Sequence, residues 1–399
     1  MNVASTDRPD VVPAPTPAAE RRRIATFRSA ADAHASAHET ATQREIARRL
    51  ASLLGYRFDD GPRGGGPDGT GSDGPGSDGT YWLPNETVVG EAAARRLGLR
   101  GRHDLFGGYV PRAFVATKAI THPRVSPDAP VPEGWSDTFA RRVDDGTLAG
   151  FTAFTRPDAL AAARTLLALG PVRLKPVTGT GGRGQRTCES PDDVERALDE
   201  LSEQAFPAGP GPGGLVVEQD LVDVATLSVG LVDVPGLVAS YVGTQRTTPD
   251  NSGEPGYGGS TLAVTRGGFE AIAAQDWPAP VRAALAAARA YDEAAHACFP
   301  GFFASRRNYD VVVGRDARGR TRCGVLEQSW RVGGASPAEV VALAALHADP
   351  GRATVRATCV ERFGAGVEPP DDAQVFYDGV DDVAGPLLKY AWCRADAHA

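Results

Sequence analysis

Cysteine and methionine are scarce in this sequence. Its 399 residues include five cysteines, which lie far apart and form no C-x-x-C pair, and one methionine at position 1. Zinc sites need closely spaced cysteines and a disulfide framework needs an even number, so the sequence favours neither. The cysteine pattern predicts a protein of a reducing compartment, and we expect a cytoplasmic location.

Long apolar runs and clustered basic residues are also missing. No stretch of about 18 apolar residues occurs, so no membrane-spanning helix is expected. The first residues have no apolar core behind a basic start, so no secretory signal is predicted. The formal net charge is -8 and the basic residues are dispersed, which argues against a nucleic-acid partner.

Two segments are too poor in apolar residues to form a core. Residues 1–22 form a Pro- and Ala-rich tail, and residues 61–80 consist almost entirely of Gly, Pro, Asp and Ser. We interpret both as disordered, and the second as an insertion within a domain. The rest of the chain is too long for one simple core, so two or three packed units are expected.

Strand patterns alternate with capped helices along the remaining sequence. Helices are predicted to begin with Ser136 as a possible N-cap, with Thr155 or Asp158 near the start of the next, and with Ser190 as the start of a third. Further helices are expected at residues 38–54, 88–98, 279–297 and 336–348. Strands are expected at residues 23–27, 105–123 (with a loop), 171–177, 214–222, 225–234, 236–246 and, as a hairpin, 308–330. This mixture indicates an α/β or α+β fold.

The segment GPVRLKPVTGTGGRGQ places Lys175 at a strand end, directly before four glycines, which are Gly179, Gly181, Gly182 and Gly184. Glycines let backbone N–H groups approach phosphate oxygens, and a lysine supplies a point charge. The loop is not a P-loop, because no Gly-Lys-Ser/Thr follows, and it does not open directly into a helix as a dinucleotide fingerprint does. From these residues alone, a phosphate loop and a plain structural turn are equally supported.

The strand VVEQDL ends with Glu218, followed by Gln219 and Leu221. Backbone groups left free at such a strand end offer the donors and acceptors that a nucleobase edge needs. A surface glutamate at the end of an ordinary strand explains the same pattern.

A hairpin in the segment YDVVVGRDARGRTRCGVLEQSW brings two acidic residues together. A two-residue turn at Arg318-Gly319 places Asp310 directly opposite Glu327, with Cβ atoms about 5 Å apart. Facing carboxylates repel each other unless a cation lies between them, and Mg²⁺ is the cation that such oxygens prefer. The alternative is two solvated carboxylates, and a one-residue bulge would change the pairing.

Ser329 and Arg331 follow Glu327 at steps of two, so on a strand they share its face. Arg331 is suited to bind a phosphate or an acyl phosphate in bidentate fashion. Ser336 and Glu339 then match a capping box at the start of a helix, whose N-terminus is a candidate anion site.

These elements, in this order, resemble the ATP-grasp superfamily. The matching segments are PVRLKPVTGTGGRG, VVEQDL, NYDVVV and VLEQSWR. The whole chain is also similar to an uncharacterised bacterial ATP-grasp-like family sometimes labelled biotin carboxylase, although no biotinyl-lysine motif is present. The resemblance implies an α/β ATP-grasp domain over residues 136–399, a glycine-loop lid over about 150–215, and a smaller N-terminal α/β domain over 23–135.

The resemblance also implies a role for each matching residue. ATP would be bound by Lys118, Lys175, Gly179, Gly181, Gly182, Gly184, Glu218, Gln219 and Leu221. Mg²⁺ would be held by Asp310, Glu327 and Ser329, where Ser329 replaces the family's usual asparagine and is a weaker ligand. Arg331, together with Lys175, would stabilise the phosphoryl group during transfer.

The function implied is an ATP- and Mg²⁺-dependent ligase, which activates a small-molecule carboxylate as an acyl phosphate for an amine or thiol. Arg246, Arg306 and Arg307 are the basic residues left for the carboxylate, and residues 257–260 form a substrate loop or a turn. A homodimer is compatible with the sequence. The alternatives are a degenerate nucleotide-binding module without ligase activity and an ATP-dependent phosphotransferase.

Overall fold

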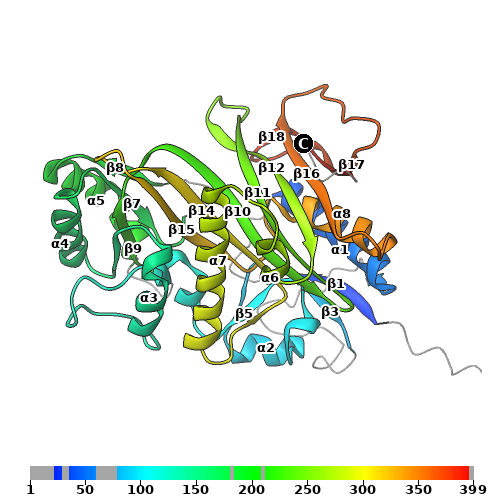
Figure 1. The fold of residues 1–399 in the computed structure, drawn as a ribbon, viewed down its shortest axis with the longest axis horizontal. Coiled ribbons are helices and arrows are strands. Elements are labelled where there is room, and N and C mark those ends of the chain that lie inside the picture. Colours follow the sequence, from blue (N-terminus) through cyan, green and yellow to red (C-terminus); the bar gives the residue numbers. More distant parts are fainter. Residues whose placement is uncertain (1–21, 29–35, 60–78, 180–183, 208–211, 395–399) are drawn as a thin grey trace, which may run out of the picture.

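The computed structural model describes residues 22–28, 36–59, 79–179, 184–207 and 212–394 (Figure 1). The strands of this part of the chain form four sheets, of three, eight, three and four strands. The predicted tail before Arg22 and most of the predicted insertion lie outside the described residues. Gly79 and Thr80, expected within the insertion, instead accept hydrogen bonds from the side chains of Arg22 and Arg23.

The N-terminal elements build a parallel three-stranded sheet in the order β2-β1-β3. Its strands are β1 (Arg23–Phe27), β2 (Arg57–Asp59) and β3 (Tyr81–Pro84). Further short elements follow: β4 (Val88–Val89), α2 (Glu91–Leu97), η1 (Arg102–Asp104), β5 (Gly108–Val110), η2 (Ala113–Ala116), η3 (Lys118–Thr121), α3 (Asp137–Val143) and η4 (Asp144–Gly146). β4 and β5 form a second three-stranded sheet with β13 (Phe303–Ala304).

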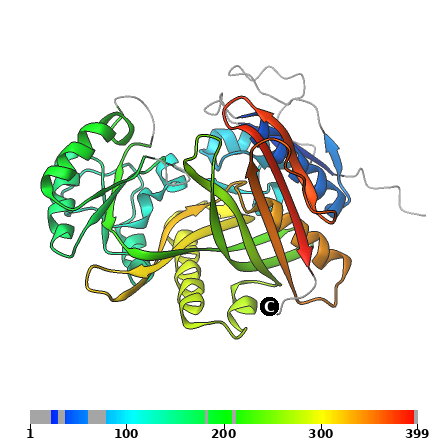
Figure 2. The same ribbon diagram turned by 90° about the horizontal axis from the view of Figure 1, so that it is seen from above.

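Helix α1 (Ala37–Leu54) begins at a capping box, in which the Ser36 hydroxyl accepts from the backbone N–H of Glu39. It ends at Gly55, whose left-handed conformation favours glycine. Its buried face, which includes Ile46 and Leu50, packs in one core with residues from the C-terminal part of the chain. The N- and C-terminal segments are therefore neighbours in space (Figure 2).

A four-stranded sheet, named here the small sheet, stands apart from the rest of the molecule (Figure 2). Its order is β6-β9-β7-β8, and helices α4 and α5 pack on it. Ser190 caps α5 as predicted, and of the two candidates for α4 the N-cap is Thr155. The bounds are β6 (Gly150–Ala153), α4 (Arg156–Leu167), β7 (Val172–Pro176), β8 (Arg186–Cys188), α5 (Pro191–Ala205) and β9 (Leu215–Gln219).

An antiparallel eight-stranded sheet, the large sheet, forms the centre of the molecule, with the order β15-β14-β10-β11-β12-β16-β18-β17. One core lies between this sheet and helices α8 and α1, and a second core lies between the sheet and helix α7. The bounds are β10 (Val222–Val234), β11 (Leu237–Pro249), β12 (Pro255–Arg266), α6 (Phe269–Ala273), α7 (Ala279–Cys298), β14 (Arg306–Arg315), β15 (Thr321–Ser329), α8 (Ser336–Ala348), β16 (Thr354–Phe363), β17 (Gln374–Asp381) and β18 (Gly385–Arg394).

The β14–β15 hairpin pairs Asp310 with Glu327, as the sequence predicts, but by a different route. The connection is a five-residue loop over 316–320, which by itself would place Asp310 opposite Leu326. A register shift beside Asp310 inserts one extra residue into β15 and moves Glu327 into the opposing position.

Three local predictions were wrong. Residues 113–121 form 3₁₀ turns rather than a strand, and residues 257–260 lie within β12 rather than in a loop. Ser336 lies inside α8 instead of capping it, because its hydroxyl accepts from the backbone N–H of Gly333, and Glu339 turns into the core.

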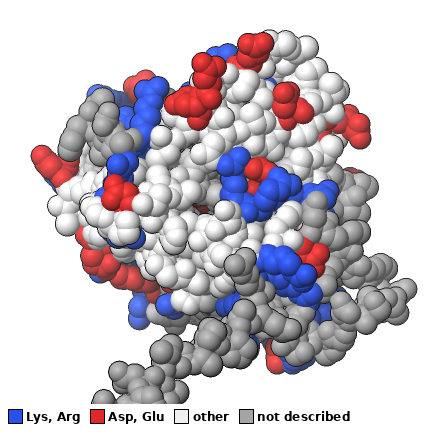
Figure 3. All heavy atoms as spheres, turned by 90° about the vertical axis from the view of Figure 1, so that its right-hand side faces the viewer, with Lys and Arg blue, Asp and Glu red and all other residues white. Residues whose placement is uncertain are grey.

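Charged side chains of both signs mix on the face of the molecule that carries α1 (Figure 3). On α1, for example, Glu45 pairs with both Arg48 and Arg49. Among the described residues, no helix is long and apolar enough to cross a membrane.

Candidate active site

A cleft of about 1910 Å³ lies between the small sheet, the large sheet and the N-terminal elements. Its walls include most of the residues that the sequence singled out. From the small sheet come Lys175, Glu218 and Gln219, with Leu221 just beyond. From the large sheet come Arg246, Arg306, Asp310, Glu327 and Ser329, and Lys118 and Arg331 complete the set.

Lys175 and Glu218 form a buried ion pair on neighbouring strands β7 and β9. Their side chains are only 3% and 2% exposed. The second carboxylate oxygen of Glu218 accepts a hydrogen bond from Nε2 of His122 at 3.1 Å. Burial alone would raise the pKa of Glu218, but the Lys175 ammonium and the His122 contact outweigh it and lower the pKa to about 2.

This geometry changes what the VVEQDL strand offers to a nucleotide. Both carboxylate oxygens of Glu218 are already engaged, so its side chain orients Lys175. The backbone N–H of Gln219, expected to be free for a base, instead donates to the carbonyl oxygen of Ala149 at 2.8 Å. Leu221 is buried at the cleft wall, where it offers apolar surface.

Lys118 lies in the 3₁₀ turn η3 and joins the two halves of the cleft. Its ammonium is 2.7 Å from Oε2 of Glu327 on the large sheet, and it also donates to the carbonyl oxygen of Gly179 after β7. Gly181 and Gly182 lie outside the described residues, whereas Gly184 adopts a left-handed conformation with φ of 71°. The ammonium of Lys118 thus lies at the start of the glycine segment and beside the carboxylate pair.

Asp310 faces Glu327 and accepts hydrogen bonds from Nε2 of Gln245 at 2.6 Å and Nδ2 of Asn308 at 3.0 Å. Burial and the neighbouring Glu327 carboxylate raise the pKa of Asp310 to about 6. Two oxygen donors that repel each other in this way suit a hard divalent cation such as Mg²⁺.

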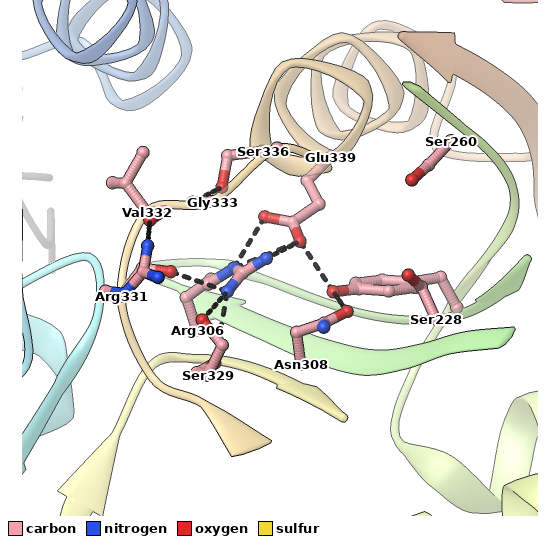
Figure 4. Close-up of polar contacts among 12 residues, drawn as sticks. Ser228, Ser260, Arg306, Asn308, Ser329, Arg331, Val332, Gly333, Ser336 and Glu339 are labelled. Carbon is pink, nitrogen blue, oxygen red and sulfur yellow. Dashed lines mark hydrogen bonds and ion pairs between the residues drawn. The ribbon is translucent and has the colours of Figure 1, made fainter. Parts of the chain in front are cut away.

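Arg306 is buried against the carboxylate of Glu339, to which its Nε and Nη2 donate, and its Nη1 donates to Ser329 and to the backbone oxygen of Arg331 (Figure 4). Burial would lower the pKa of Arg306, but the Glu339 carboxylate raises it. All three guanidinium nitrogens therefore serve the protein itself. The Arg306 guanidinium is therefore held by the protein and is not presented to a substrate carboxylate.

Arg307 was also predicted to bind substrate, but it does not line the cleft. Adjacent strand residues point to opposite faces, so Arg307 faces α7, where its Nη1 donates to Asp292. Arg246 and Arg331 do line the cleft, where Arg246 donates to Gly258 and Arg331 pairs with Glu86 at 3.3 Å.

Sequence reasoning missed His122, Gln245 and Asn308. Asn308 precedes Asp310 by two positions on a strand, so alternation alone would have placed the two side chains on one face. His122 and Gln245 carry no local signal, since they lie far along the chain from Glu218 and Asp310.

Comparison with known proteins gives a family. The family model described as "Protein of unknown function (DUF3182)" matches residues 26–391. The chain belongs to this family. A search of curated proteins finds no significant match.

Solved structures identify the fold of this DUF3182 protein. It resembles carboxyaminoimidazole ribonucleotide synthase from Aspergillus clavatus complexed with ATP, with a TM-score of 0.50, 13% identity and coverage of 95% of both chains. It also resembles the biotin carboxylase domain of 2-oxoglutarate carboxylase from Hydrogenobacter thermophilus in complex with MgADP, ADP and bicarbonate. Here the TM-score is 0.52 with 12% identity, and the match covers 94% of this chain and 87% of the other. The fold is an α/β ATP-grasp fold, as the sequence predicts.

Proposed function

We propose that this protein is an ATP- and Mg²⁺-dependent ligase that activates a small-molecule carboxylate as an acyl phosphate for attack by an amine or thiol. The observation that carries the proposal is the 2.7 Å ion pair between Lys118 and Glu327. It brings a cation suited to phosphate next to a carboxylate pair suited to Mg²⁺. Transfer of a phosphoryl group from MgATP needs this combination of positioning and charge neutralisation.

In the proposed reaction, a carboxylate oxygen of the substrate attacks the γ-phosphorus of ATP, and the bond to the bridging oxygen of ADP breaks. The amine or thiol then attacks the acyl carbon and displaces inorganic phosphate. Lys118 and Lys175 would neutralise the phosphates, and Lys175 has enough donors to keep Glu218 as a partner. Arg331 would bind the phosphoryl group, and Arg246 is the remaining candidate for the substrate carboxylate.

Mg²⁺ fits the donor set that the chain provides. Asp310 and Glu327 would hold it, and Ser329 would be the third, weaker ligand. The Ser329 hydroxyl accepts from Arg306 at 3.3 Å and keeps a lone pair for a metal. The ion would neutralise the phosphate oxygens.

A nucleotide-binding module without ligase activity is the second candidate. It is favoured by Ser329, which replaces the family's usual asparagine and would be a weaker metal ligand. Incubation with ATP, Mg²⁺ and pools of carboxylates and amines separates the candidates. A ligase forms ADP and a condensed product, a phosphotransferase forms ADP and a phosphorylated acceptor, and a binding module forms neither.

MgADP is expected to raise the melting temperature of the protein, because a ligand that binds only the folded state stabilises it, by about 2.7 kcal/mol at 100 times its Kd. Lys175→Ala should remove this shift. The variant also leaves Glu218 buried without its cation, so the ligand-induced shift is compared rather than the melting temperature itself. Arg289→Ala, on the exposed side of α7, is the control and should keep the full shift. An unchanged melting temperature at millimolar MgADP would contradict nucleotide binding.

A cytoplasmic location is also part of the proposal, supported by the five cysteines, which are all free thiols in the structure. The homodimer stays a prediction, which light scattering on the purified protein tests.

A further inference from the structure

Glu339 is a buried carboxylate for which the proposed reaction has no direct use. It lies in the first turn of α8 and its side chain is fully buried, as is that of its partner Arg306. Replacing both partners of a buried ion pair by apolar residues often leaves stability unchanged, so stability alone is a poor reason for such a pair. Glu339 is instead connected by hydrogen bonds, through Arg306 and Tyr241, to side chains that line the cleft.

The first branch from Glu339 runs through Arg306 to the end of β15. Nη1 of Arg306 donates to the backbone oxygen of Ser329 at 3.1 Å, to its hydroxyl at 3.3 Å and to the backbone oxygen of Arg331 at 2.6 Å (Figure 4). One guanidinium group, oriented by Glu339 through Nε and Nη2, therefore fixes the backbone that carries Ser329 and Arg331.

The second branch runs through Tyr241 to the carboxylate pair. Oη of Tyr241 lies 2.6 Å from Oε1 of Glu339 and 2.9 Å from Oδ1 of Asn308, and its one proton can be donated to either oxygen. Nδ2 of Asn308 then donates to Oδ1 of Asp310 at 3.0 Å. These contacts place the Asn308 amide between Tyr241 and Asp310, where it holds the Asp310 carboxylate.

We propose that Glu339 is a positioning residue, which through Arg306 and Tyr241 holds Ser329, Arg331 and Asp310 in one geometry around a divalent cation. The inference rests on the proposed function, because it assigns the organised groups to MgATP. Residues that hold metal ligands in place typically affect metal affinity by about 10- to 100-fold.

The opposite face of β14 provides a matched control. There Arg307 pairs with Asp292 at 3.0 Å, and the Tyr309 hydroxyl donates to Asp292 at 2.6 Å. This second set has the same chemistry, its arginine lies on the same strand and its ion pair is also largely buried, but it packs against α7 and none of its three residues lines the cleft. A role in folding alone would give the two sets similar effects on the metal site.

The test compares Glu339→Gln with Asp292→Asn in the full-length protein. Mn²⁺ is the probe, and its dissociation constant is measured by electron paramagnetic resonance at saturating ADP, alongside the affinity for ADP without metal. We expect Glu339→Gln to weaken Mn²⁺ binding by about 10- to 100-fold, with little change in metal-free ADP binding, because Lys175 and Glu218 are untouched. Asp292→Asn should keep wild-type Mn²⁺ affinity.

Tyr241→Phe and Tyr309→Phe provide a second comparison, because each removes only a hydroxyl and keeps the core filled. Tyr241→Phe should weaken Mn²⁺ binding and Tyr309→Phe should not. If Glu339→Gln bound Mn²⁺ as tightly as Asp292→Asn, and Tyr241→Phe as tightly as Tyr309→Phe, the positioning role would be overturned. The proposed function would remain intact. A wild-type protein that binds ADP but no Mn²⁺ would overturn both the positioning role of Glu339 and the proposed function.

Discussion

Glu327→Gln is expected to weaken Mg²⁺ binding in the presence of ADP by more than about 100-fold, since loss of groups that merely support a ligand already costs 10- to 100-fold. Glu327 supplies one of the two facing carboxylates and the 2.7 Å contact to Lys118. The substitution keeps the volume and removes one charge. Isothermal titration of Mg²⁺ into the protein with saturating ADP measures the effect.

The fold should survive this substitution. Lys118 loses its ion pair but keeps its hydrogen bond to the carbonyl oxygen of Gly179, and the substitution removes the repulsion that contributes to the raised pKa of Asp310. Glu293→Gln on the exposed side of α7 is the matched control and should bind Mg²⁺ as the wild type does. If Glu327→Gln kept wild-type metal affinity, the carboxylate pair would not be the metal site.

Glu218→Gln is expected to destabilise the protein by about 3–5 kcal/mol at pH 7, because it leaves the Lys175 ammonium buried without its partner. The lowered pKa of Glu218 leads to a similar estimate of this loss in the free energy of unfolding. A fall from 4.5 to about 2 on folding corresponds to about 3 kcal/mol. Urea denaturation of the two proteins measures the difference in free energy of unfolding.

The difference between wild type and Glu218→Gln should depend on pH in a defined direction. Because the folded pKa lies below the unfolded one, the stabilisation by Glu218 is fully present above about pH 4.5 and is lost as the pH falls toward 2. The two free energies of unfolding should therefore converge between pH 4.5 and 2. A constant difference across this range would show that packing, and not charge, causes the loss.

Asp220→Asn is the matched control for this measurement. Asp220 pairs with Arg173 at 2.7 Å next to the same strand end, but this pair is partly exposed. Screening by solvent limits such pairs to about 1 kcal/mol or less. A loss for Asp220→Asn as large as that for Glu218→Gln would contradict the importance of burial.

Several elements of this protein could be predicted from the sequence, because they depend on local physical chemistry alone. The N-caps at Ser136 and Ser190 and the strand that carries Lys175 depend on residues within one turn or one strand, so the sequence predicts them directly. The facing of Asp310 and Glu327 was also predicted, although from a two-residue turn. The structure reaches it with a five-residue loop and one extra residue in β15, two features that offset each other.

The sequence by itself determined which residue types reach the cleft: two lysines, a carboxylate pair and an arginine after a strand. Only the tertiary structure decided what each of them contacts. Glu218 binds Lys175 and His122, Arg306 binds Glu339, and Arg307 faces α7, away from the cleft. The reason is that a buried charge must find a partner. That partner comes from whichever distant element packs against it, which is information that local sequence does not contain.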